Sequence, residues 1–597
     1  MCGIMGYVGE REAAEVLLKG LKALEYRGYD SSGIAVHTGA NLSVVKRAGR
    51  IAKLEEALTE APIGGRCGIG HTRWATHGIP TDQNAHPFVS ECGKFAVVHN
   101  GIISNYLSLA AFLKRRGVNL RSDTDSEVVA HLIDYYYTGD VLAAVCRAAR
   151  ELAGSFALGV ISVYEQNVLY GVRKDSPILV GKGEKECAIC SDTSGFSDLC
   201  KEFYPLQNGE IVRVTSTEIE LFDFFEKPRP ITFTTGEKEE LSEREEGEDF
   251  MHCEIRQIPL ALLSGEESFP TRELSDLFKK EYRDILLLGC GSAYHAGLIF
   301  KGAMRELAGT FVRDEIASEF VTQRGGAGKD TLVIAVSQSG ETADTLLAVR
   351  KAKREGATVL SVCNVRASSL VRLSDHAIIT KCGRERAVAA TKSYVAQAHA
   401  LLMICLLYAE CKGKADHATL ARLRASLAEL PEKAELVLEE EEHLSRVALA
   451  AKDARAVFFL GRGQDYYAAR EGSLKLKEIS YLFSEAYPSG ELKHGTLALM
   501  EKGVFGVIVA TDPRLAEKNA ATLSEIVCRG ASAIVIATQS IALKMGADYV
   551  VALPDADPLF TPLLSAVAMQ EFAYFVAKAR GCDVDKPRNL AKSVTVE

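Results

Sequence analysis

Short apolar runs, many of them ending in glycine and separated by polar turns, fill the first 236 residues. GIAVHTG (33–39), KFAVVHNG (94–101) and FALGVISVY (156–164) are examples. Apolar runs of this length between turn residues are typical of strands, so the pattern predicts a strand-rich α+β domain over residues 1–236. Residues 237–249, EKEELSEREEGED, are almost all charged or small. They predict an acidic linker, either solvated or a frayed helix.

After residue 249 the pattern changes to an apolar run, a glycine or serine turn and a long amphipathic stretch, and this order recurs. It is typical of parallel βαβ units. Three segments of this half match later segments at offsets of about 172 to 174 residues: DILLLGCGS (284–292) with AVFFLGRGQ (456–464), DTLVIAVSQSGET (330–342) with VFGVIVATDPRL (504–515), and ATVLSVCN (357–364) with ASAIVIAT (531–538). The repeat predicts two copies of one doubly wound parallel-sheet domain, 250–435 and 436–597.

The two copies differ at one turn between a strand and a helix. In the first copy, VSQSGET offers the hydroxyls of Ser337, Ser339 and Thr342 and the amide of Gln338. Free backbone N–H groups and the helix dipole favour an anion at such a turn. The second copy has VATDPRL (509–515), in which the aspartate repels an anion and the proline removes a donor. We therefore expect only the first copy to bind phosphate.

Composition narrows the possible functions. The chain has 597 residues, of which 47% are hydrophobic and 25% charged, with a net charge of −9. These values exclude disorder over the whole chain and argue against nucleic acid as the main partner. No stretch approaches the roughly 20 apolar residues of a membrane span, and no export signal opens the chain, so we expect a cytoplasmic protein without a membrane partner. Fifteen cysteines without framework spacing indicate reduced thiols, and CAIC (187–190) is expected to form a strand and not a zinc site.

A cysteine follows the initiator methionine in MCGIMGYVG. Removal of Met1 would give Cys2 a thiol nucleophile and a free α-amine base in one residue. An N-terminal Cys-Gly is more often incidental, so this hypothesis depends on whether other segments supply residues suited to the same chemistry.

The segments HTRWATHG (71–78) and VVHNGII (97–103) supply such residues. Arg73 can pair with a carboxylate, and Asn100 with the Gly101 N–H can form an oxyanion hole. Asp125, in RSDTDSEVVAHL, can bind an ammonium group, although Asp123 or Asp125 capping the following helix is the simpler interpretation. The four histidines of this region, at positions 71, 77, 86 and 99, match no metal-ligand spacing and are expected to be hydrogen-bonded structural residues.

Two segments of the second half carry possible acid–base groups. Glu478 in SLKLKEISY and His494 in ELKHG can act together, and Lys475 lies on the helical face of Glu478 while Lys477 does not. Solvated surface charge is the alternative. Lys592 lies five residues from the end, where a lysine matters only if the tail folds into a site, because a desolvated lysine can form a Schiff base with a sugar carbonyl.

These motifs together carry a resemblance. MCGIMGYVG, LEYRGYDSSGIAV, HTRWATHGIPTDQNAHP and VVHNGIISNY resemble N-terminal-nucleophile glutaminase domains, whose fold is a four-layer αββα sandwich. GCGSAYHAG, SQSGETADT, EGSLKLKEISY, GELKHGTLAL and DVDKPRNLAKSVTVE resemble paired sugar isomerase domains. In this order over residues 1–597 they resemble the glucosamine-6-phosphate synthase family, the glutamine–fructose-6-phosphate aminotransferases.

The resemblance implies a role for residues of the glutaminase half. Cys2 would be the nucleophile and Asn100 and Gly101 the oxyanion hole. The glutamine-binding set would be Arg73, Thr76, His77 and Asp125, with Arg27 in a lid and Trp74 gating an internal ammonia channel.

For the isomerase half, the resemblance implies that His494 opens the fructose ring and Lys592 forms an imine with the ketone. Glu478 would then transfer a proton between C1 and C2, assisted by Lys475. The sugar-phosphate-binding set would be Ser292, Ser337, Gln338, Ser339, Thr342, Val388 and Ala591.

The implied reaction converts L-glutamine and fructose 6-phosphate to glutamate and glucosamine 6-phosphate, the first step of the amino-sugar (hexosamine) pathway. The resemblance implies neither a metal nor an organic cofactor, and a homodimer formed through the isomerase domains. Four positions depart from the family pattern and bear on sugar preference: Ala293, Arg384, Arg386 and Ala390. They keep open an enzyme acting on another phosphosugar. A sensor that binds sugar phosphate without turnover is a third alternative, but it has no need of Cys2 or Lys592.

Overall fold

The computed structural model describes residues 2–75, 77–196, 199–235 and 247–594. The chain forms two compact units, one from residues 1–238 with 593–597 and the other from residues 239–592. Most of the predicted acidic linker, residues 237–246, lies outside the described residues.

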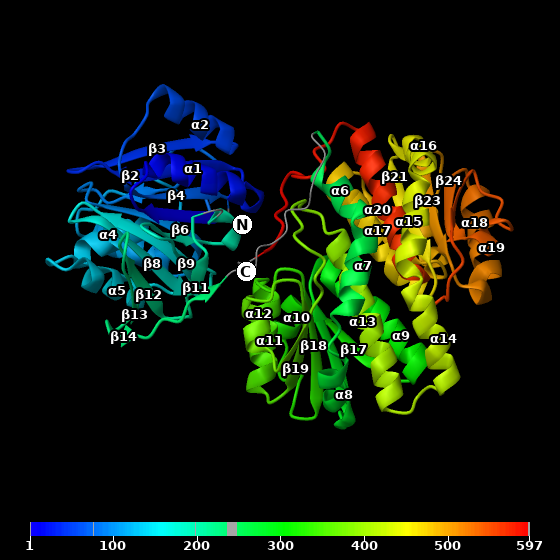
Figure 1. Ribbon diagram of the computed structural model, residues 1–597. Helices are drawn as coiled ribbons and strands as arrows, with labels where there is room; N and C mark the ends of the chain where they lie inside the picture. The colour runs from blue at the N-terminus through cyan, green and yellow to red at the C-terminus, as the bar shows by residue number, and fades with distance from the viewer. Residues whose placement is uncertain (1, 76, 197–198, 236–246, 595–597) are drawn as a thin grey trace. The chain divides into compact units, whose positions relative to one another are not determined.

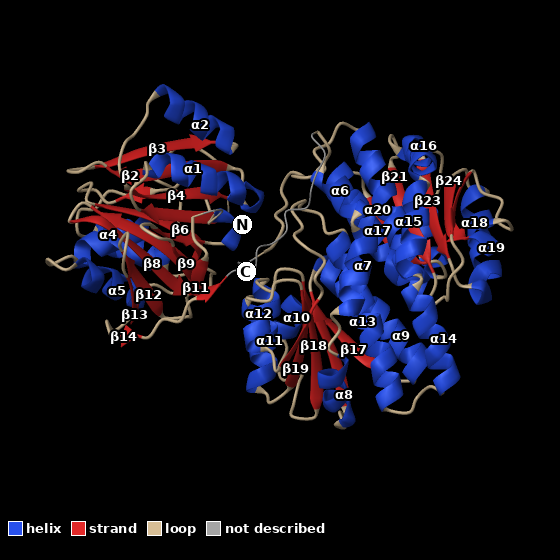
Figure 2. Cartoon of the chain, viewed as in Figure 1, coloured by secondary structure: helices blue, strands red, loops and turns tan. Residues whose placement is uncertain are grey.

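The first unit is built on two antiparallel sheets (Figures 1 and 2). One sheet has the order β15 (Thr234–Thr235), β11 (Glu202–Pro205), β9 (Leu179–Lys182), β10 (Cys187–Cys190), β1 (Gly3–Val8), β4 (Cys67–Arg73), β2 (Ser31–His37) and β3 (Leu42–Ala48). The other has the order β14 (Pro228–Arg229), β13 (Ile219–Asp223), β12 (Glu210–Val214), β8 (Glu165–Lys174), β7 (Gly154–Ser162), β6 (Phe95–Ile103) and β5 (Phe88–Val89).

Helices cover both outer faces of this pair of sheets. α1 (Ala13–Leu24) and α2 (Ile51–Glu60) pack on the first sheet, and α3 (Tyr106–Lys114), α4 (Glu127–Tyr136) and α5 (Val141–Glu151) pack on the second. Between the sheets, side chains that alternate along each strand form a third core, exemplified by Ile4, Ile69 and Val98. The αββα sandwich is therefore confirmed, and CAIC forms the predicted strand.

The second unit contains two parallel sheets of the same topology. The first has the order β17 (Val312–Ile316), β16 (Asp284–Gly289), β18 (Thr331–Ser337), β19 (Thr358–Cys363) and β20 (His376–Ile379). The second has the order β22 (Ser484–Pro488), β21 (Ala456–Gly461), β23 (Val504–Ala510), β24 (Ser532–Thr538) and β25 (Tyr549–Leu553). In each sheet the strand that comes first in the chain lies between the second and the third.

The sheet register confirms the repeat. Leu332 pairs with Thr358 in the first sheet, and Phe505 pairs with Ser532 in the second. The matching strands begin at 284, 331 and 358 and at 456, 504 and 532, so they are 172, 173 and 174 residues apart. Two doubly wound sheets were predicted and both are present.

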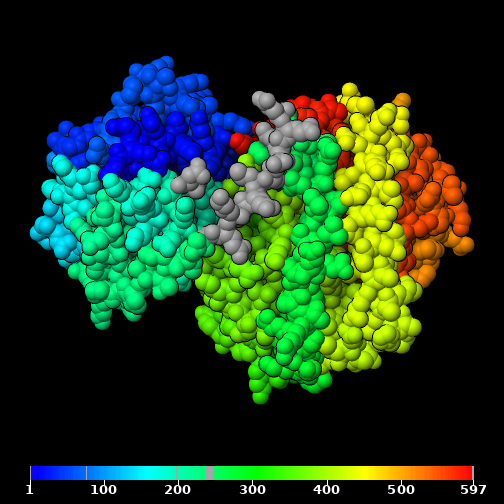
Figure 3. Space-filling view, viewed as in Figure 1, coloured from blue at the N-terminus to red at the C-terminus, as the bar shows by residue number. Residues whose placement is uncertain are grey.

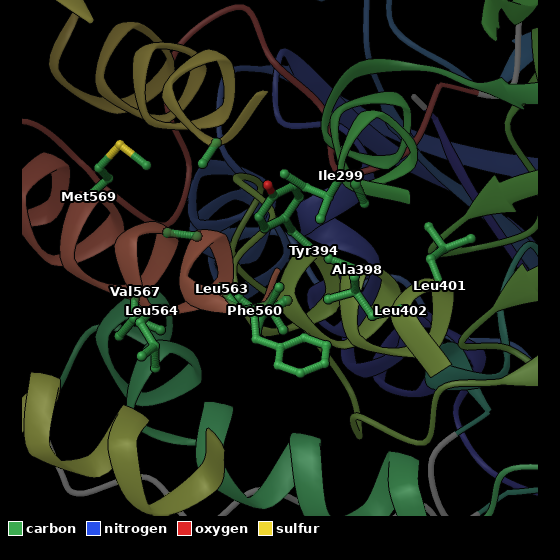
Figure 4. Close-up of a cluster of buried hydrophobic side chains, with 14 of the residues drawn as sticks. Ile299, Tyr394, Ala398, Leu401, Leu402, Phe560, Leu563, Leu564, Val567 and Met569 are labelled. Carbon is green, nitrogen blue, oxygen red and sulfur yellow. The ribbon is translucent and has the colours of Figure 1, made fainter. Parts of the chain in front are cut away.

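Helices surround and join the two sheets of this unit. They are α6 (Phe250–Arg256), α7 (Ile258–Glu267), α8 (Thr271–Lys279), α9 (Gly291–Ala308), α10 (Ala317–Thr322), α11 (Ala343–Arg354), α12 (Ser369–Leu373), α13 (Lys392–Cys411), α14 (His417–Ala428), α15 (Leu430–Glu439), α16 (Glu441–Ala451), α17 (Gln464–Ser480), α18 (Ala516–Val527), α19 (Gln539–Ala542) and α20 (Thr561–Ala579). One core runs through both copies, with Tyr394 and Leu401 of α13 near Phe560 and Leu563 (Figure 4). On the face shown in Figure 3, residues of α14 to α16 (yellow) lie between first-copy residues in green and second-copy residues in orange.

α13 corrects one expectation from the sequence. Among the described residues it is a helix long and apolar enough to cross a membrane by length and composition. Its apolar window is 89% buried inside the protein. The helix is apolar on all sides because it passes through the core that the two copies share.

Candidate active sites

Cys2 lies directly before β1, at the end of the first sheet, and is half-buried. Its Sγ accepts a hydrogen bond from the Trp74 backbone N–H at 3.2 Å, just beyond the end of the adjacent strand β4. Burial raises the pKa of the Cys2 thiol, while the Trp74 amide and the Arg73 guanidinium lower it. A thiol in this position needs a base before it can attack, and the α-amine of a processed Cys2 would be the nearest one by covalent connection.

Asn100 points its amide nitrogen at Cys2. Nδ2 donates to the Cys2 carbonyl at 3.1 Å and to Ser191 Oγ at 2.8 Å. His71 Nε2 lies 3.0 Å from Asn100 Oδ1 and 2.9 Å from the His99 carbonyl, and because both are acceptors this nitrogen carries the proton. Burial lowers the pKa of His71 to about 3, so the ring is neutral. The neutral imidazole fixes the amide with its N–H₂ group toward Cys2.

The backbone conformation and close packing at position 101 require glycine. Its φ is +126°, and an added Cβ would lie 1.9 Å from the Ser155 carbonyl oxygen on the paired strand β7. Asn100 and Gly101 lie within β6, so the strand itself presents the two proposed oxyanion donors.

The proposed glutamine-binding residues line the same end of the sheets. Arg73 Nη2 donates to the His77 and Gly78 carbonyls, and its buried Nη1 has no hydrogen-bond partner among the described residues. A buried guanidinium N–H without a partner is costly and is suited to a ligand carboxylate. The His77 ring meets Tyr106 edge to face at 5.6 Å. Thr76 lies outside the described residues.

Asp125 does not cap the following helix. α4 begins at Glu127 with Ser126 at its N-cap, and the Asp125 carboxylate instead accepts the Ile103 N–H at 2.8 Å and the Ser126 hydroxyl at 3.2 Å. The capping interpretation is wrong for Asp125 because β6 supplies a nearer backbone donor. Ser126 also bonds His99 Nδ1 at 2.7 Å, which connects the carboxylate to the histidines.

Arg27 and Trp74 flank Cys2. Arg27, in the 3₁₀ turn Glu25–Arg27, donates from Nε to the Cys2 carbonyl at 3.3 Å and pairs with Asp192 at 3.3 Å. The Trp74 ring packs edge to face on Tyr29 at 5.7 Å.

In the second unit, the loop between β18 and α11 lies at the point where strand order reverses. In doubly wound sheets ligands bind at this point, outside the carboxyl ends of the strands. Ser337 Oγ and Thr342 Oγ1 are 3.1 Å apart, and Ser337 Oγ also accepts the Gly340 N–H at 3.1 Å. Ser339 Oγ accepts the Glu341 N–H at 3.2 Å. The hydroxyls are therefore gathered before the first turn of α11, and Gln338 lies in the same loop.

In the second copy, the backbone N–H at the corresponding turn is already bonded to a carboxylate of the protein. Asp465 accepts the Thr511 N–H at 2.9 Å and is fully buried. Thr511 is the first residue after β23 and corresponds to Gln338, the first residue after β18. Asp465 lies four residues after the end of β21 and corresponds to Ala293, four residues after the end of β16. The difference between Ala293 and Asp465 thus keeps this donor available in the first copy only.

Charged side chains from both copies meet in one buried cluster. Lys475 Nζ lies 2.6 Å from Glu478 and 3.4 Å from Glu471 on α17, and it donates to Ser292 Oγ of the first copy at 3.1 Å. Ser292 in turn donates to Glu471 at 2.7 Å, and His295 Nδ1 lies 2.8 Å from Glu471. The predicted helical face is confirmed, since Lys477 is exposed and pairs with Glu485 instead.

The cluster shifts the pKa values of the Glu478 and Glu471 carboxyl groups in opposite directions. Burial raises the pKa of Glu478, although Lys475 opposes the shift. Burial also acts on Glu471, but Lys475, His295 and Ser292 lower its pKa below the ordinary value. A carboxyl with a raised pKa beside one that stays ionised is the arrangement expected of an acid–base group and its support.

Lys592 of the tail reaches a buried carboxylate. Its Nζ pairs with Glu385, and their side chains are 5% and 0% exposed. Val388, in the same loop as Glu385, donates its N–H to the Asp585 carbonyl at 2.9 Å. The Asp585 carboxylate accepts the Phe250 and Met251 amides at the start of α6, so the tail is tied to the unit before it reaches Lys592. Ala591 is half-buried next to it.

His494 is exposed on the 3₁₀ turn Glu491–His494. Within the described residues no hydrogen bond or ion pair joins it to Glu478 or Lys592. Its role in ring opening remains a prediction.

Sequence reasoning missed three residues of this cluster: Glu385, Glu471 and His295. Glu471 precedes Lys475 by four positions on one helical face, a signal the sequence offered. Glu385 lies between Arg384 and Arg386, in a segment identified only for its departures, and nothing in its spacing connects it to position 592.

Comparison with known proteins decides the family. The glutamine amidotransferase domain model matches residues 71–196, and the SIS domain model matches residues 277–407 and 452–575. Over the full length of both chains, the sequence is 44% identical to the glutamine–fructose-6-phosphate aminotransferases (isomerizing) of Clostridium tetani and Clostridium perfringens. The chain belongs to the glutamine–fructose-6-phosphate aminotransferase (isomerizing) family. It is an enzyme of that kind, with a glutamine amidotransferase domain and two sugar isomerase domains.

The second unit of this aminotransferase resembles a solved structure of the same family. The C-terminal domain of glucosamine-fructose-6-phosphate aminotransferase from Francisella tularensis matches 58% of the chain and all of that domain, with 34% identity and a TM-score of 0.55.

Proposed function

We propose that the enzyme transfers the amide nitrogen of L-glutamine to D-fructose 6-phosphate and yields D-glucosamine 6-phosphate and L-glutamate. The observation that carries the proposal is the position of Lys592: it pairs with buried Glu385, and its charge acts on Glu478, the partner of Lys475. A ketose phosphate with its phosphate at Ser337–Thr342 would present its carbonyl carbons to such a cluster. The names of the curated relatives support the same substrates.

In the glutaminase half, Cys2 would attack the glutamine amide carbon after its proton passes to its own α-amine. A thioester forms, ammonia leaves, and water then releases glutamate. Asn100 Nδ2 and the Gly101 N–H would stabilise the oxyanion, Arg73 Nη1 would hold the substrate carboxylate, and Asp125 would hold its ammonium group. This chemistry requires removal of Met1.

In the isomerase half, Lys592 would form an imine with C2 of the open-chain sugar after His494 has opened the ring. Ammonia then displaces the lysine, and Glu478 carries a proton from C1 to C2. Burial raises the pKa of Glu478, and a raised pKa supports this shuttle because a carboxyl that holds its proton more tightly is a better base toward C1. No step uses a metal or an organic cofactor.

We further propose that ammonia passes between the two sites within the protein, with Trp74 as a gate, and that the enzyme acts as a homodimer through its isomerase domains. Trp74→Ala is expected to release ammonia to solvent, so glutamate would form in excess of amino sugar. One-to-one products from this variant would contradict the gate.

Labelled nitrogen tests the proposed function. The enzyme is given amide-¹⁵N glutamine and fructose 6-phosphate in the presence of unlabelled ammonium, and the sugar product is identified by mass spectrometry. We expect ¹⁵N-glucosamine 6-phosphate from the wild type and none from Lys592→Ala. Another aminated sugar phosphate from a substrate panel, at a higher rate, would overturn the assigned substrate.

A further inference from the structure

Glu385 is a buried carboxylate fixed by several donors. It accepts the Thr391 N–H at 2.9 Å, the Ser393 N–H at 3.0 Å and the Ser393 hydroxyl at 2.6 Å, all at the start of α13. It also accepts the Thr391 hydroxyl at 3.3 Å and pairs with the Lys592 ammonium group. The N-terminal end of a 20-residue helix adds a favourable potential for a negative charge.

These donors keep the carboxylate ionised. Although burial raises it, the Lys592 ammonium and the Ser393 donors bring the pKa of Glu385 to about 2. Glu254, a buried neighbour on α6, differs: burial and the charge of Glu385 raise its pKa to about 8. Near neutrality Glu254 is therefore protonated, and Glu385 carries the negative charge that faces Lys592.

Imine formation conserves the charge on the lysine nitrogen. A lysine ammonium group and a ketone give a protonated imine and one water molecule, with one positive charge on each side of the reaction. A carboxylate that stabilises the ammonium group therefore also stabilises the iminium group that replaces it. Protonation matters because ammonia adds to the electrophilic carbon of an iminium far more readily than to a neutral imine.

We propose that Glu385 is the counter-ion of the protonated imine at Lys592 and keeps C2 of the sugar electrophilic until ammonia arrives. The proposal rests on the role of Lys592 in the proposed function. It differs from simple docking of the tail, because a counter-ion changes the pH range over which the iminium persists.

Other titratable groups face the pair. They are Glu254 on α6, Cys382 and Lys392 beside the start of α13, and Lys475 and Glu478 on α17. Cys382, Lys392, Lys475 and Glu478 are common to the wild type and a Glu385 variant, but the charge of Glu385 also helps to raise the pKa of Glu254. The comparison is therefore repeated with Glu254→Gln in both proteins, so that a shift in the pH profile between them reports on Glu385.

Trapping with cyanoborohydride tests the counter-ion. This reagent delivers hydride to an iminium but not to a neutral imine, so its rate follows the protonated fraction. The full-length enzyme is equilibrated with fructose 6-phosphate without glutamine, reduced between about pH 6 and 9, and the modified residue is located by peptide mass. In Glu385→Gln we expect the fall in trapping to begin at least one pH unit lower, with about tenfold less adduct near pH 8.

Three variants accompany it. Glu385→Asp keeps the charge and is expected to keep the wild-type profile. Glu571→Gln removes a different buried carboxyl, on α20, and is also expected to keep it. Glu385→Ala also removes the charge but places no amide in the site, and it is expected to shift the profile as Glu385→Gln does, which preserves the test if Glu385→Gln does not fold.

The outcomes separate the two proposals. A wild type that traps sugar at Lys592, with the same profile in Glu385→Gln, overturns the counter-ion and leaves the proposed function intact. If Glu385→Gln does not fold, an unchanged profile in Glu385→Ala overturns it equally. A wild type that gives no adduct at Lys592 overturns both.

Discussion

Lys475 of the second copy donates a hydrogen bond to Ser292 of the first copy at 3.1 Å. The contact joins two residues that are 183 positions apart in the chain and lie on α9 and α17, helices of different copies. The proposed phosphate-binding loop belongs to the first copy, while Glu471, Lys475 and Glu478 belong to the second. Neither copy therefore holds the proposed sugar site alone, which gives a physical reason for the duplication to be kept in one chain.

Ser292→Ala tests this contact. Without the hydroxyl, Glu471 loses a donor and Lys475 an acceptor in a buried place, which costs about 1 to 2 kcal/mol. We expect kcat/KM for amino sugar formation to fall roughly 5- to 30-fold while glutaminase activity stays unchanged. Ser275→Ala, at an exposed serine on α8, is the matched control. A normal amination rate in Ser292→Ala would show that the contact is dispensable.

Cys2→Ala separates the two chemistries. The thiol is the proposed nucleophile of the first unit only, so glutamine hydrolysis is expected to vanish while isomerisation of fructose 6-phosphate without glutamine continues. Cys92→Ala, which removes an exposed cysteine of the same unit, is expected to leave both activities intact. Loss of sugar isomerisation in Cys2→Ala would contradict the division of labour.

Asp585→Ala tests how the tail is held. Its carboxylate accepts the Phe250 and Met251 amides at 2.9 and 2.8 Å, so its removal leaves two donors of α6 without partners and loosens the path to Lys592. We expect about tenfold slower amination with unchanged glutaminase activity. Asp583→Ala, two residues earlier and exposed, serves as the control. Equal rates in the two variants would mean that Asp585 does not position the tail.

Glu571 predicts a pH dependence of stability. It is 1% exposed, its oxygens have no hydrogen-bond partner among the described residues, and burial raises its pKa from 4.5 to about 8. Between these two pKa values Glu571 stays protonated in the folded protein but is ionised in the unfolded chain. Its contribution to the free energy of unfolding is therefore fully present below pH 4.5 and is lost as the pH rises toward 8.

The glutamine side chain of Glu571→Gln does not titrate, so this variant lacks the pH-dependent contribution of Glu571. Thermal denaturation between about pH 5 and 8 is expected to show a loss of stability of a few kcal/mol in the wild type that is smaller in the variant. Parallel curves for the two proteins would show that Glu571 is ionised in the folded state.

Local pattern was enough to predict much of the isomerase half. The position of the Ser337–Thr342 turn between a strand and a helix and the shared face of Lys475 and Glu478 depend on strand and helix periodicity within one chain segment, and the repeat follows from comparing two such segments. Phosphate binding at the turn stays a prediction. The buried apolar helix α13 was missed as a possible span because Gln397 and His399 interrupt its apolar run.

Contacts between distant segments could not be predicted in the same way. Glu385 meets Lys592 across 207 residues, and Asp125 bonds the Ile103 amide instead of capping its own helix. Both depend on how separate elements pack. The segment around Glu385 offered only the two flanking arginines, and the residues that hold the carboxylate are ordinary backbone amides and a serine.

One chain is expected both to release ammonia at Cys2 and to add it to a sugar phosphate held at Lys592. The most direct measurement uses purified protein whose mass confirms Cys2 as the first residue. The protein is incubated with L-glutamine and fructose 6-phosphate, and glutamate and glucosamine 6-phosphate are quantified in the same sample. The account predicts equal amounts of the two products. Glutamate without any amino sugar would contradict it.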